Sequence, residues 1–230
     1  ASDLRDSPFL QIWSANHGIV RSLSFAEVAQ RVRMAQALFE NEGIAAEGDR
    51  VAFLAHPSAQ FFIYSLAVMC RGAVSVNLNW RQPIEALVAM LQLAGSTVAI
   101  ATAAFRSEAY QLEVKKVWWL PSAAGDVRGF GERSESQGFL ASLDGELTVE
   151  EAEAQGLLQE HRRCDVEGSA IAAIMFTSGS TSTPKAVPLT HSGLLWNCEQ
   201  KRAVSPGLAG APNAGTLSFL PNFHVIGFTN

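Results

Sequence analysis

Short apolar runs alternate with helical patterns along the first half of the chain, and this alternation limits the fold more than any other feature. Residues 50–55, 73–76 and 97–101 have the length and the apolar content of buried strands. Helices are predicted over 58–71 and 83–94, each of them followed by a glycine that ends it. Strands that alternate with helices are typical of an α/β domain, layered around a mainly parallel sheet that is flanked by helices.

Two further elements flank this region. Ser24 and Glu27 have the spacing of a capping box, so a helix is predicted to begin there and to stop at Gly43. Residues 115–120 are rich in valine and tryptophan and are predicted to form another strand.

Residues 177–185, which read TSGSTSTPK, are the most informative stretch and follow the apolar run 171–176. The pattern predicts an exposed loop at the end of a buried strand, and residues 187–191 then lead toward a helix that begins near Ser192. Hydroxyl groups, backbone N–H groups and one cation can together surround a phosphate chain. Gly179 permits the turn that such a loop needs. The polar groups belong to Thr177, Ser178, Ser180, Thr181 and Lys185.

Two other interpretations compete with this one. The P-loop of nucleotide hydrolases needs a second glycine directly before its lysine and a hydroxyl residue directly after it. Pro184 and Ala186 occupy those places, which excludes the standard P-loop. A cluster of Ser, Thr, Gly and Pro between apolar segments is also typical of an ordinary surface loop. Composition by itself leaves that alternative open.

The ordered string over residues 177–191 resembles the phosphate loop of the adenylate-forming (AMP-binding) superfamily, whose usual form is TSGTTGxPKGVxLTH. This superfamily includes acyl-CoA synthetases, luciferases and the adenylation domains of peptide synthetases. Residues 48–54 are similar to its GDRV strand, and residues 71–79 to its AGAVxVPLNP segment. Residues 220–228, LPNFHVIGF, match its LPxFHxxGF signature. The resemblance implies that the chain is a partial N-terminal domain of an adenylate-forming enzyme.

The resemblance also assigns roles to residues. It implies phosphate contacts to ATP, which binds with Mg²⁺, from Thr177, Ser178, Gly179, Ser180, Thr181 and Lys185. It places His224 and Gly227 beside a carboxylate substrate, where the histidine positions the substrate and transfers no proton. The implied reaction gives an acyl adenylate and pyrophosphate, after which a thiol of coenzyme A or of a carrier protein receives the acyl group. No catalytic residue is assigned, because the family's catalytic lysine belongs to a region beyond Asn230.

Two positions depart from the usual phosphate loop. Ser182 stands where the family has a second glycine, and Ala186 follows Lys185 where a glycine is usual. If either position requires a positive φ, its side chain costs roughly 1 to 2 kcal/mol. Such strain would misplace the loop, and weak activity or none would follow.

The chain divides into a first α/β lobe over 1–120, a segment without a recognised pattern over 121–164, and a part over 165–230 that carries the loop and the histidine motif. Within the middle segment, residues 121–137 indicate a loop or a boundary, and residues 148–163 have the pattern of an acidic surface helix.

The family's adenine-binding, ribose-binding and C-terminal segments have no counterpart before Asn230. We therefore expect this chain to be inactive by itself and to form the first part of a longer ligase. The alternative is a catalytically inactive scaffold or binding subunit whose apolar edge a partner chain covers. An acyl chain is the favoured carboxylate, since the residues around His224 are apolar. An aryl acid and an amino acid are the other candidates.

Composition argues against several other classes of function. The formal charge is −5, and no basic run indicates nucleic-acid binding. The longest apolar run, 61–70, is about half of what a membrane span requires. Three cysteines without metal-ligand spacing indicate reduced thiols and an intracellular protein, for which a cytoplasmic and an organellar location both fit. The histidines are scattered, so no metal site is predicted. Trp13, Trp80 and Trp196 are interpreted as packing residues.

Overall fold

The computed structural model describes residues 4–14, 18–41, 43–112, 114–120, 165–177, 184–204 and 221–229. The described strands are β1 (Pro8–Ser14), β2 (Gly18–Ser24), β3 (Arg50–Leu54), β4 (Val74–Asn77), β5 (Val98–Thr102), β6 (Lys116–Leu120), β7 (Ile171–Thr177) and β8 (Lys185–Thr190). The α-helices are α1 (Phe25–Asn41), α2 (Ala59–Cys70), α3 (Ile84–Ala94), α4 (Arg106–Gln111), α7 (His191–Val204) and α8 (Val225–Thr229). Single 3₁₀ turns lie at Leu4–Asp6 and Ala103–Phe105.

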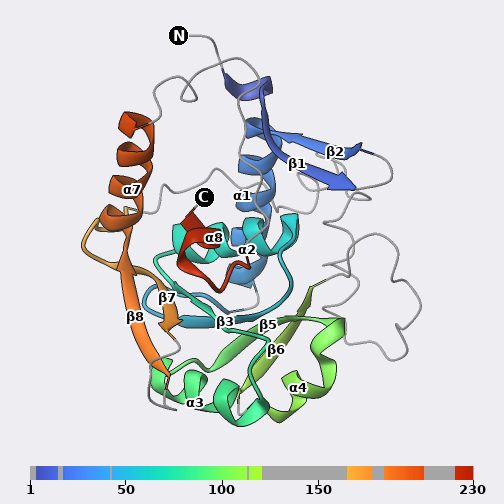
Figure 1. Cartoon of the computed structure of the whole chain (residues 1–230), viewed down its shortest axis with the longest axis vertical. Helices are drawn as coiled ribbons and strands as arrows, with labels where there is room; N and C mark the ends of the chain where they lie inside the picture. The colour runs from blue at the N-terminus through green and yellow to red at the C-terminus, as the bar shows by residue number, and fades with distance from the viewer. Residues whose placement is uncertain are drawn as a thin grey trace.

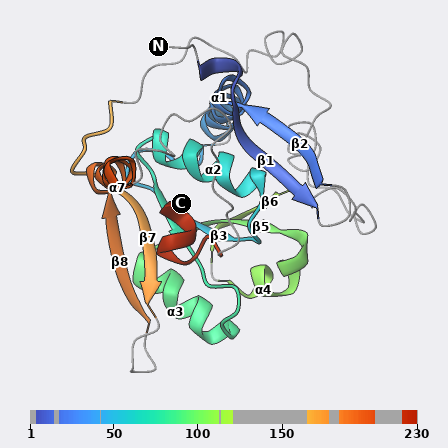
Figure 2. The same ribbon diagram turned by 45° about the horizontal axis from the view of Figure 1, so that its top comes forward.

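A six-stranded sheet lies at the centre, with α1 and α2 on one face and α3 and α4 on the other (Figure 1). The strand order is β6-β5-β3-β4-β7-β8, and every neighbouring pair is parallel except β7 and β8. Strands β1 and β2 form a separate antiparallel hairpin beside α1 (Figure 2). The fold class predicted from the sequence, a mainly parallel α/β sheet flanked by helices, is confirmed.

Alternation along β3 shows how the sheet separates two apolar cores. Val51 and Phe53 pack with α1 and α2, whereas Ala52 and Leu54 pack with α3 and α4. Successive strand residues point to opposite faces, so a strand covered on both sides reads as a continuous apolar run. The predicted strand over 50–55 has this property because it lies inside the sheet.

The helix ends follow the signals in the sequence. The backbone N–H of Glu27 donates to Ser24 Oγ over 3.2 Å, and the backbone N–H of Ser24 donates to the Glu27 carboxylate over 2.7 Å, which completes the capping box. Ser58 caps α2 through its hydroxyl. Gly72 and Gly95, which follow α2 and α3, have φ values of 75° and 68°, a region that favours glycine.

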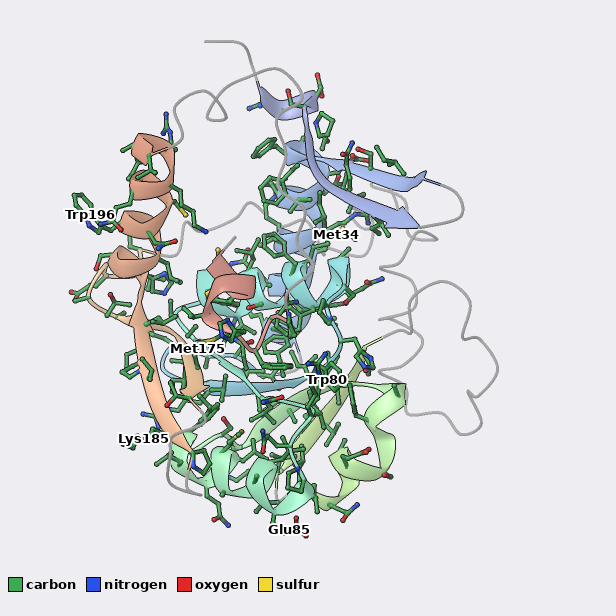
Figure 3. All side chains as sticks on the ribbon, viewed as in Figure 1. Met34, Trp80, Glu85, Met175, Lys185 and Trp196 are labelled. Carbon is green, nitrogen blue, oxygen red and sulfur yellow. The ribbon has the colours of Figure 1, made fainter. Side chains whose placement is uncertain are left out.

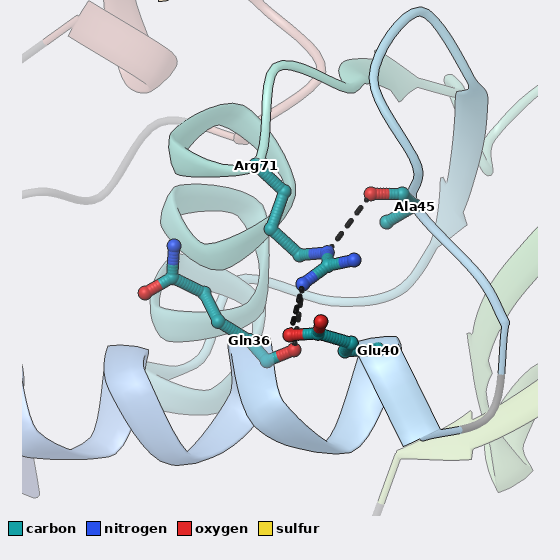
Figure 4. Close-up of polar contacts among 4 residues, drawn as sticks. All are labelled: Gln36, Glu40, Ala45 and Arg71. Carbon is teal, nitrogen blue, oxygen red and sulfur yellow. Dashed lines mark hydrogen bonds and ion pairs between the residues drawn. The ribbon is translucent and has the colours of Figure 1, made fainter. Parts of the chain in front are cut away.

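Arg71, the residue that ends α2, connects three parts of the chain (Figure 4). Its Nε donates to the Ala45 carbonyl over 3.0 Å, and its Nη1 donates to the Gln36 carbonyl over 3.2 Å. The Glu40 carboxylate lies 3.4 Å from the same Nη1. Ala45 has a φ of 55°, so the guanidinium holds the α1–β3 connection where the backbone is left-handed.

Three elements differ from the sequence prediction. Residues 187–191 belong mostly to β8 and do not simply lead into a helix, and β8 tolerates Pro188 because it borders only β7 among the described strands. The β1–β2 hairpin and the short helix α4 were not predicted. The predicted loop over 121–137 and the predicted acidic helix over 148–163 lie outside the described residues.

Candidate functional site

The β7–β8 hairpin places two of the predicted phosphate ligands side by side. Thr177 ends β7, Lys185 begins β8, and the two are register partners in the antiparallel pair. Directly opposite residues of such a pair lie on the same face of the sheet, with Cβ atoms about 5 Å apart. Both residues are exposed. The structure therefore puts a hydroxyl and a cation together at the base of the connecting segment 178–183.

The segment 178–183 itself lies outside the described residues. The predicted phosphate contacts of Ser178, Gly179, Ser180 and Thr181 fall on it and stay predictions. The predicted loop boundaries change at both ends, because Thr177 and Lys185 belong to strands. Their pairing depends on tertiary structure, which a hydroxyl-rich sequence alone does not indicate.

Ala186 does not carry the strain that its substitution for glycine could have introduced. It lies in β8 opposite Phe176, and both side chains pack against the apolar core between the sheet and helices α3 and α4. Ala45 is the one non-glycine residue with a positive φ in the described part of the chain. Ala186 is therefore compatible with its extended backbone, whereas Ser182 lies outside the described residues.

A buried polar chain links helix α2, strand β4 and strand β7, the strand of the hairpin that borders β4. The Ser65 and Ser75 hydroxyls lie 2.8 Å apart, and Ser75 Oγ donates to Asn77 Oδ1 over 3.3 Å. Asn77, which is 1% exposed, donates from Nδ2 to the Met175 sulfur over 3.3 Å. Met175 precedes Thr177 by two residues on the same strand face. The position of the hairpin is thus tied to the end of β4.

The predicted histidine motif crosses the edge of the sheet at which the parallel strands end. Phe223 contacts Trp80, which follows β4 by three residues and packs with the α3–α4 core. Phe228 packs against the other core, formed by α1 and α2 with the sheet. His224 and Gly227 lie between these two contacts. In open α/β sheets ligands bind beyond the carboxyl ends of the strands, which is where this motif lies.

Four aromatic side chains form a cluster at this edge, which we call the edge cluster: His56, Trp80, Phe105 and Phe223. The first three follow β3, β4 and β5 by two or three residues each. In Figure 3, Trp80 is labelled near the centre of the molecule, whereas Trp196 projects outward from α7. The sequence predicts only a packing role for Trp80 and no role for His56. Their one common signal is their position just after predicted strands.

The two predicted pocket residues differ in exposure. Gly227 is buried in α8, whereas His224 is exposed and precedes it. The backbone N–H of His224 donates to the Pro221 carbonyl over 3.0 Å, and the N–H of Phe228 donates to the His224 carbonyl over 3.0 Å. These bonds fix the backbone of His224 in a compact turn. Pocket membership is consistent with this placement and stays a prediction.

Neither a metal-ligand cluster nor a membrane-spanning helix is found among the described residues. No cluster of three or more His, Cys, Asp or Glu side chains there could hold a metal ion. None of the helices described above has the length and apolar character needed to cross a membrane.

Known proteins resemble this chain over most of its length. 4-Coumarate–CoA ligase-like 9 from Oryza sativa subsp. japonica is 28% identical over 212 residues, which cover 91% of this chain and 35% of the relative. A hybrid PKS-NRPS synthetase from Macrophomina phaseolina is 28% identical over 187 residues, covering 80% of this chain and 4% of the relative. The crystal structure of an acyl-CoA synthetase from Brucella canis superposes with a TM-score of 0.70 at 17% identity, covering 97% of this chain and 37% of that one.

The chain thus spans about a third of the plant ligase and a far smaller part of the fungal synthetase. The sequence profile of the AMP-binding enzyme family matches residues 5–230, which is nearly the whole chain. Together with the shared fold, this match shows that the chain belongs to the AMP-binding enzyme family.

Proposed function

We propose that this chain is part of an ATP-dependent ligase that activates a carboxylate as an acyl adenylate and then transfers the acyl group to a thiol. The observation that carries the proposal is the pairing of Thr177 with Lys185 across β7 and β8, at the base of a hydroxyl-rich segment. A cation and backbone N–H groups at a strand end are suited to a polyphosphate. Membership of the AMP-binding family supports ATP as that polyphosphate.

The main electrostatic requirement of the proposed reaction is stabilisation of the leaving pyrophosphate. When a carboxylate oxygen attacks the α-phosphorus of ATP, the P–O bond to the β-phosphate breaks and negative charge develops on pyrophosphate. Lys185 and the hydroxyl of Thr177 would stabilise that charge, with Mg²⁺ arriving on the nucleotide and neutralising its phosphates. The exposure of Lys185 suits a group that engages the nucleotide when it binds and releases it afterwards.

The relatives favour a carboxylic acid as substrate and a thiol as acceptor, by their names. The plant relative is named for coumarate and for CoA, and the structural relative for acyl-CoA. The fungal relative is a PKS-NRPS synthetase. We therefore retain coenzyme A and a carrier-protein thiol as acceptors. An acyl chain remains our first candidate substrate, and an aryl acid the second.

The deciding experiment measures carboxylate-dependent ATP–pyrophosphate exchange by the full-length natural protein that contains this chain. Fatty, aryl and amino acids should be compared at equal concentration, with Lys185→Ala as the negative control. We expect exchange with at least one acid and its loss in the variant. A folded natural protein that binds ATP but exchanges pyrophosphate with no acid would overturn this proposal in favour of an inactive scaffold.

A further inference from the structure

We propose that Trp80 is a positioning residue for the carboxylate pocket: by packing against Phe223 it fixes the start of the segment that carries His224 and Gly227. The inference rests on the proposed function, because it concerns the pocket of that same reaction. It extends the site to a residue outside both recognised motifs of the second half of the chain.

The contact between Trp80 and Phe223 is specific in geometry. The ring centroids lie 5.9 Å apart with an interplanar angle of 82°, an edge-to-face arrangement. Such a pair stabilises the contact beyond the effect of the apolar area that it buries. Phe223 precedes His224 directly, so a shift of its ring moves the backbone of the histidine.

Trp80 is itself held from other strand ends. The ring centroid of His56, which follows β3, lies 4.6 Å from the ring centroid of Trp80. The ring centroid of Phe105, which follows β5, lies 5.7 Å from it. The guanidinium of Arg81 lies 5.0 Å from the ring centroid, a cation–π contact. The indole is therefore held in place by residues at the edge of the sheet and gives Phe223 a fixed surface to pack against.

The histidine segment has a second support on the opposite side of the sheet. Phe228 packs against the core of α1 and α2, and its N–H donates to the His224 carbonyl. A segment with two supports holds His224 in one place, whereas loss of either support allows it to pivot about the other. Trp80 supplies the support nearer to His224.

The indole N–H does not explain the position of Trp80. Trp80 Nε1 is buried and has no hydrogen-bond partner among the residues that the structure describes. The support therefore comes from the ring, and a phenylalanine should provide much of it. A leucine fills part of the volume but has no ring edge or face to present. This difference separates positioning by the ring from packing by bulk.

The first test measures the segment directly, by hydrogen exchange of the backbone amides of residues 221–229 in the uninterrupted natural protein. Trp80→Leu should increase deuterium uptake there, and Trp80→Phe should restore most of the protection. Trp118→Leu is the matched control, since Trp118 is a buried indole on β6 whose Nε1 likewise has no partner in the described ranges. Uptake in Trp80→Leu that equals the uptake in Trp118→Leu would overturn the proposal.

The second test measures the consequence for catalysis. Trp80→Leu should raise the KM for the carboxylate about fivefold or more, while the KM for ATP changes less than about twofold. Phe223→Leu should have the same effect on the two KM values. The double variant Trp80→Leu/Phe223→Leu should raise the KM for the carboxylate little more than each single variant does. Equal changes in both KM values, or a Trp80→Phe variant as impaired as Trp80→Leu, would contradict positioning.

The two tests separate this inference from the proposed function. If the wild-type protein exchanges pyrophosphate with no acid, the proposed function fails and the pocket assignment falls with it. The hydrogen-exchange result still decides whether Trp80 holds the segment. If the wild type is active and Trp80→Leu leaves both the segment and the carboxylate KM unchanged, the inference alone fails.

Discussion

Lys185 is the residue on which the proposed chemistry depends most directly. It occupies the first position of β8, is exposed, and lies opposite Thr177. An exposed lysine contributes little to folding, because its ammonium stays hydrated in the folded and the unfolded chain. Its replacement therefore distinguishes a functional cation from a structural one.

Lys185→Ala should lower adenylate formation by roughly 100-fold, the usual cost of one lost donor to a developing anion. The midpoint of thermal unfolding should change by no more than about 1 °C, since the side chain is not packed. Pyrophosphate exchange and a thermal melt measure the two effects. Lys115→Ala is the matched control, because Lys115 is exposed at the opposite end of the sheet, just before β6. Wild-type exchange in Lys185→Ala would contradict the assignment.

Arg71 stabilises the packing of α2 against α1 more through its two carbonyl acceptors than through the Glu40 carboxylate. The Glu40 side chain is 75% exposed, so its ion pair is screened by water. The Ala45 and Gln36 carbonyls accept from a guanidinium that is mostly buried. Two donors that diverge from one planar group can reach both carbonyls together.

Arg71→Lys should lower the free energy of unfolding by about 1 to 2 kcal/mol. One ammonium group cannot donate to both carbonyls, so one buried carbonyl loses its hydrogen bond from this side chain. Arg202→Lys is the control, since that arginine is exposed and pairs with Glu199 on the same helix. We expect the control to change stability by less than about 0.5 kcal/mol. Urea unfolding checks both, and equal losses in the two variants would show that the carbonyl bonds carry no special weight.

The start of α7 carries a pH dependence that can be measured. Burial lowers the pKa of His191 below its usual 6.5, and its buried Nε2 has no hydrogen-bond partner within the described part of the chain. The unfolded chain therefore binds the proton at a higher pH than the folded chain does. The stability that the neutral ring provides is complete above pH 6.5 and is lost as the pH falls below that value, toward the lowered pKa.

His191→Gln removes this titration, so its stability should vary less with pH below 6.5 than that of the wild type. Urea midpoints measured for both proteins from pH 7.5 down to 5 check the difference. An identical slope in wild type and variant would assign the pH dependence to other groups.

The sequence predicted those elements that depend on local signals. Helix α1 begins at its capping box, α2 and α3 end before glycines, and the central strands are continuous apolar runs. Strand β8 was missed, because it contains Pro188 and owes its extended form to pairing with β7. The edge cluster was missed for a similar reason. Its members are far apart in sequence, and only the parallel topology brings His56, Trp80 and Phe105 to one edge.

The candidate site lies along one edge of the central sheet. The hairpin of β7 and β8 and the edge cluster both lie where parallel strands end. Helix α7, which follows β8, has no buried residue, and its Leu195 and Trp196 are 68% and 66% exposed. The described part of the chain supplies the hairpin to which we assign phosphate binding and the segment that we propose for one side of the carboxylate pocket. In the proposed reaction, the same site would also have to hold the nucleoside of ATP.

Residues 1–230 alone should release no pyrophosphate in response to a carboxylate. They span 35% of the plant ligase and 37% of the Brucella synthetase, and the resemblance places the adenine contacts, the ribose contact and the catalytic lysine of the family outside them. Alignment of the carboxylate with the α-phosphorus accounts for much of the rate in such a reaction, and one isolated hairpin cannot provide it.

Purified residues 1–230 and the uninterrupted natural protein should be assayed side by side for carboxylate-dependent pyrophosphate release. We expect carboxylate-dependent release only in the natural protein, and only while Lys185 is present. Weak ATP binding by residues 1–230 that disappears in Lys185→Ala would show that the hairpin contacts phosphate without the rest of the site. Robust turnover by residues 1–230 would instead mean that these residues already carry every group that the reaction needs, and the assignment of the nucleoside contacts to segments outside them would be wrong.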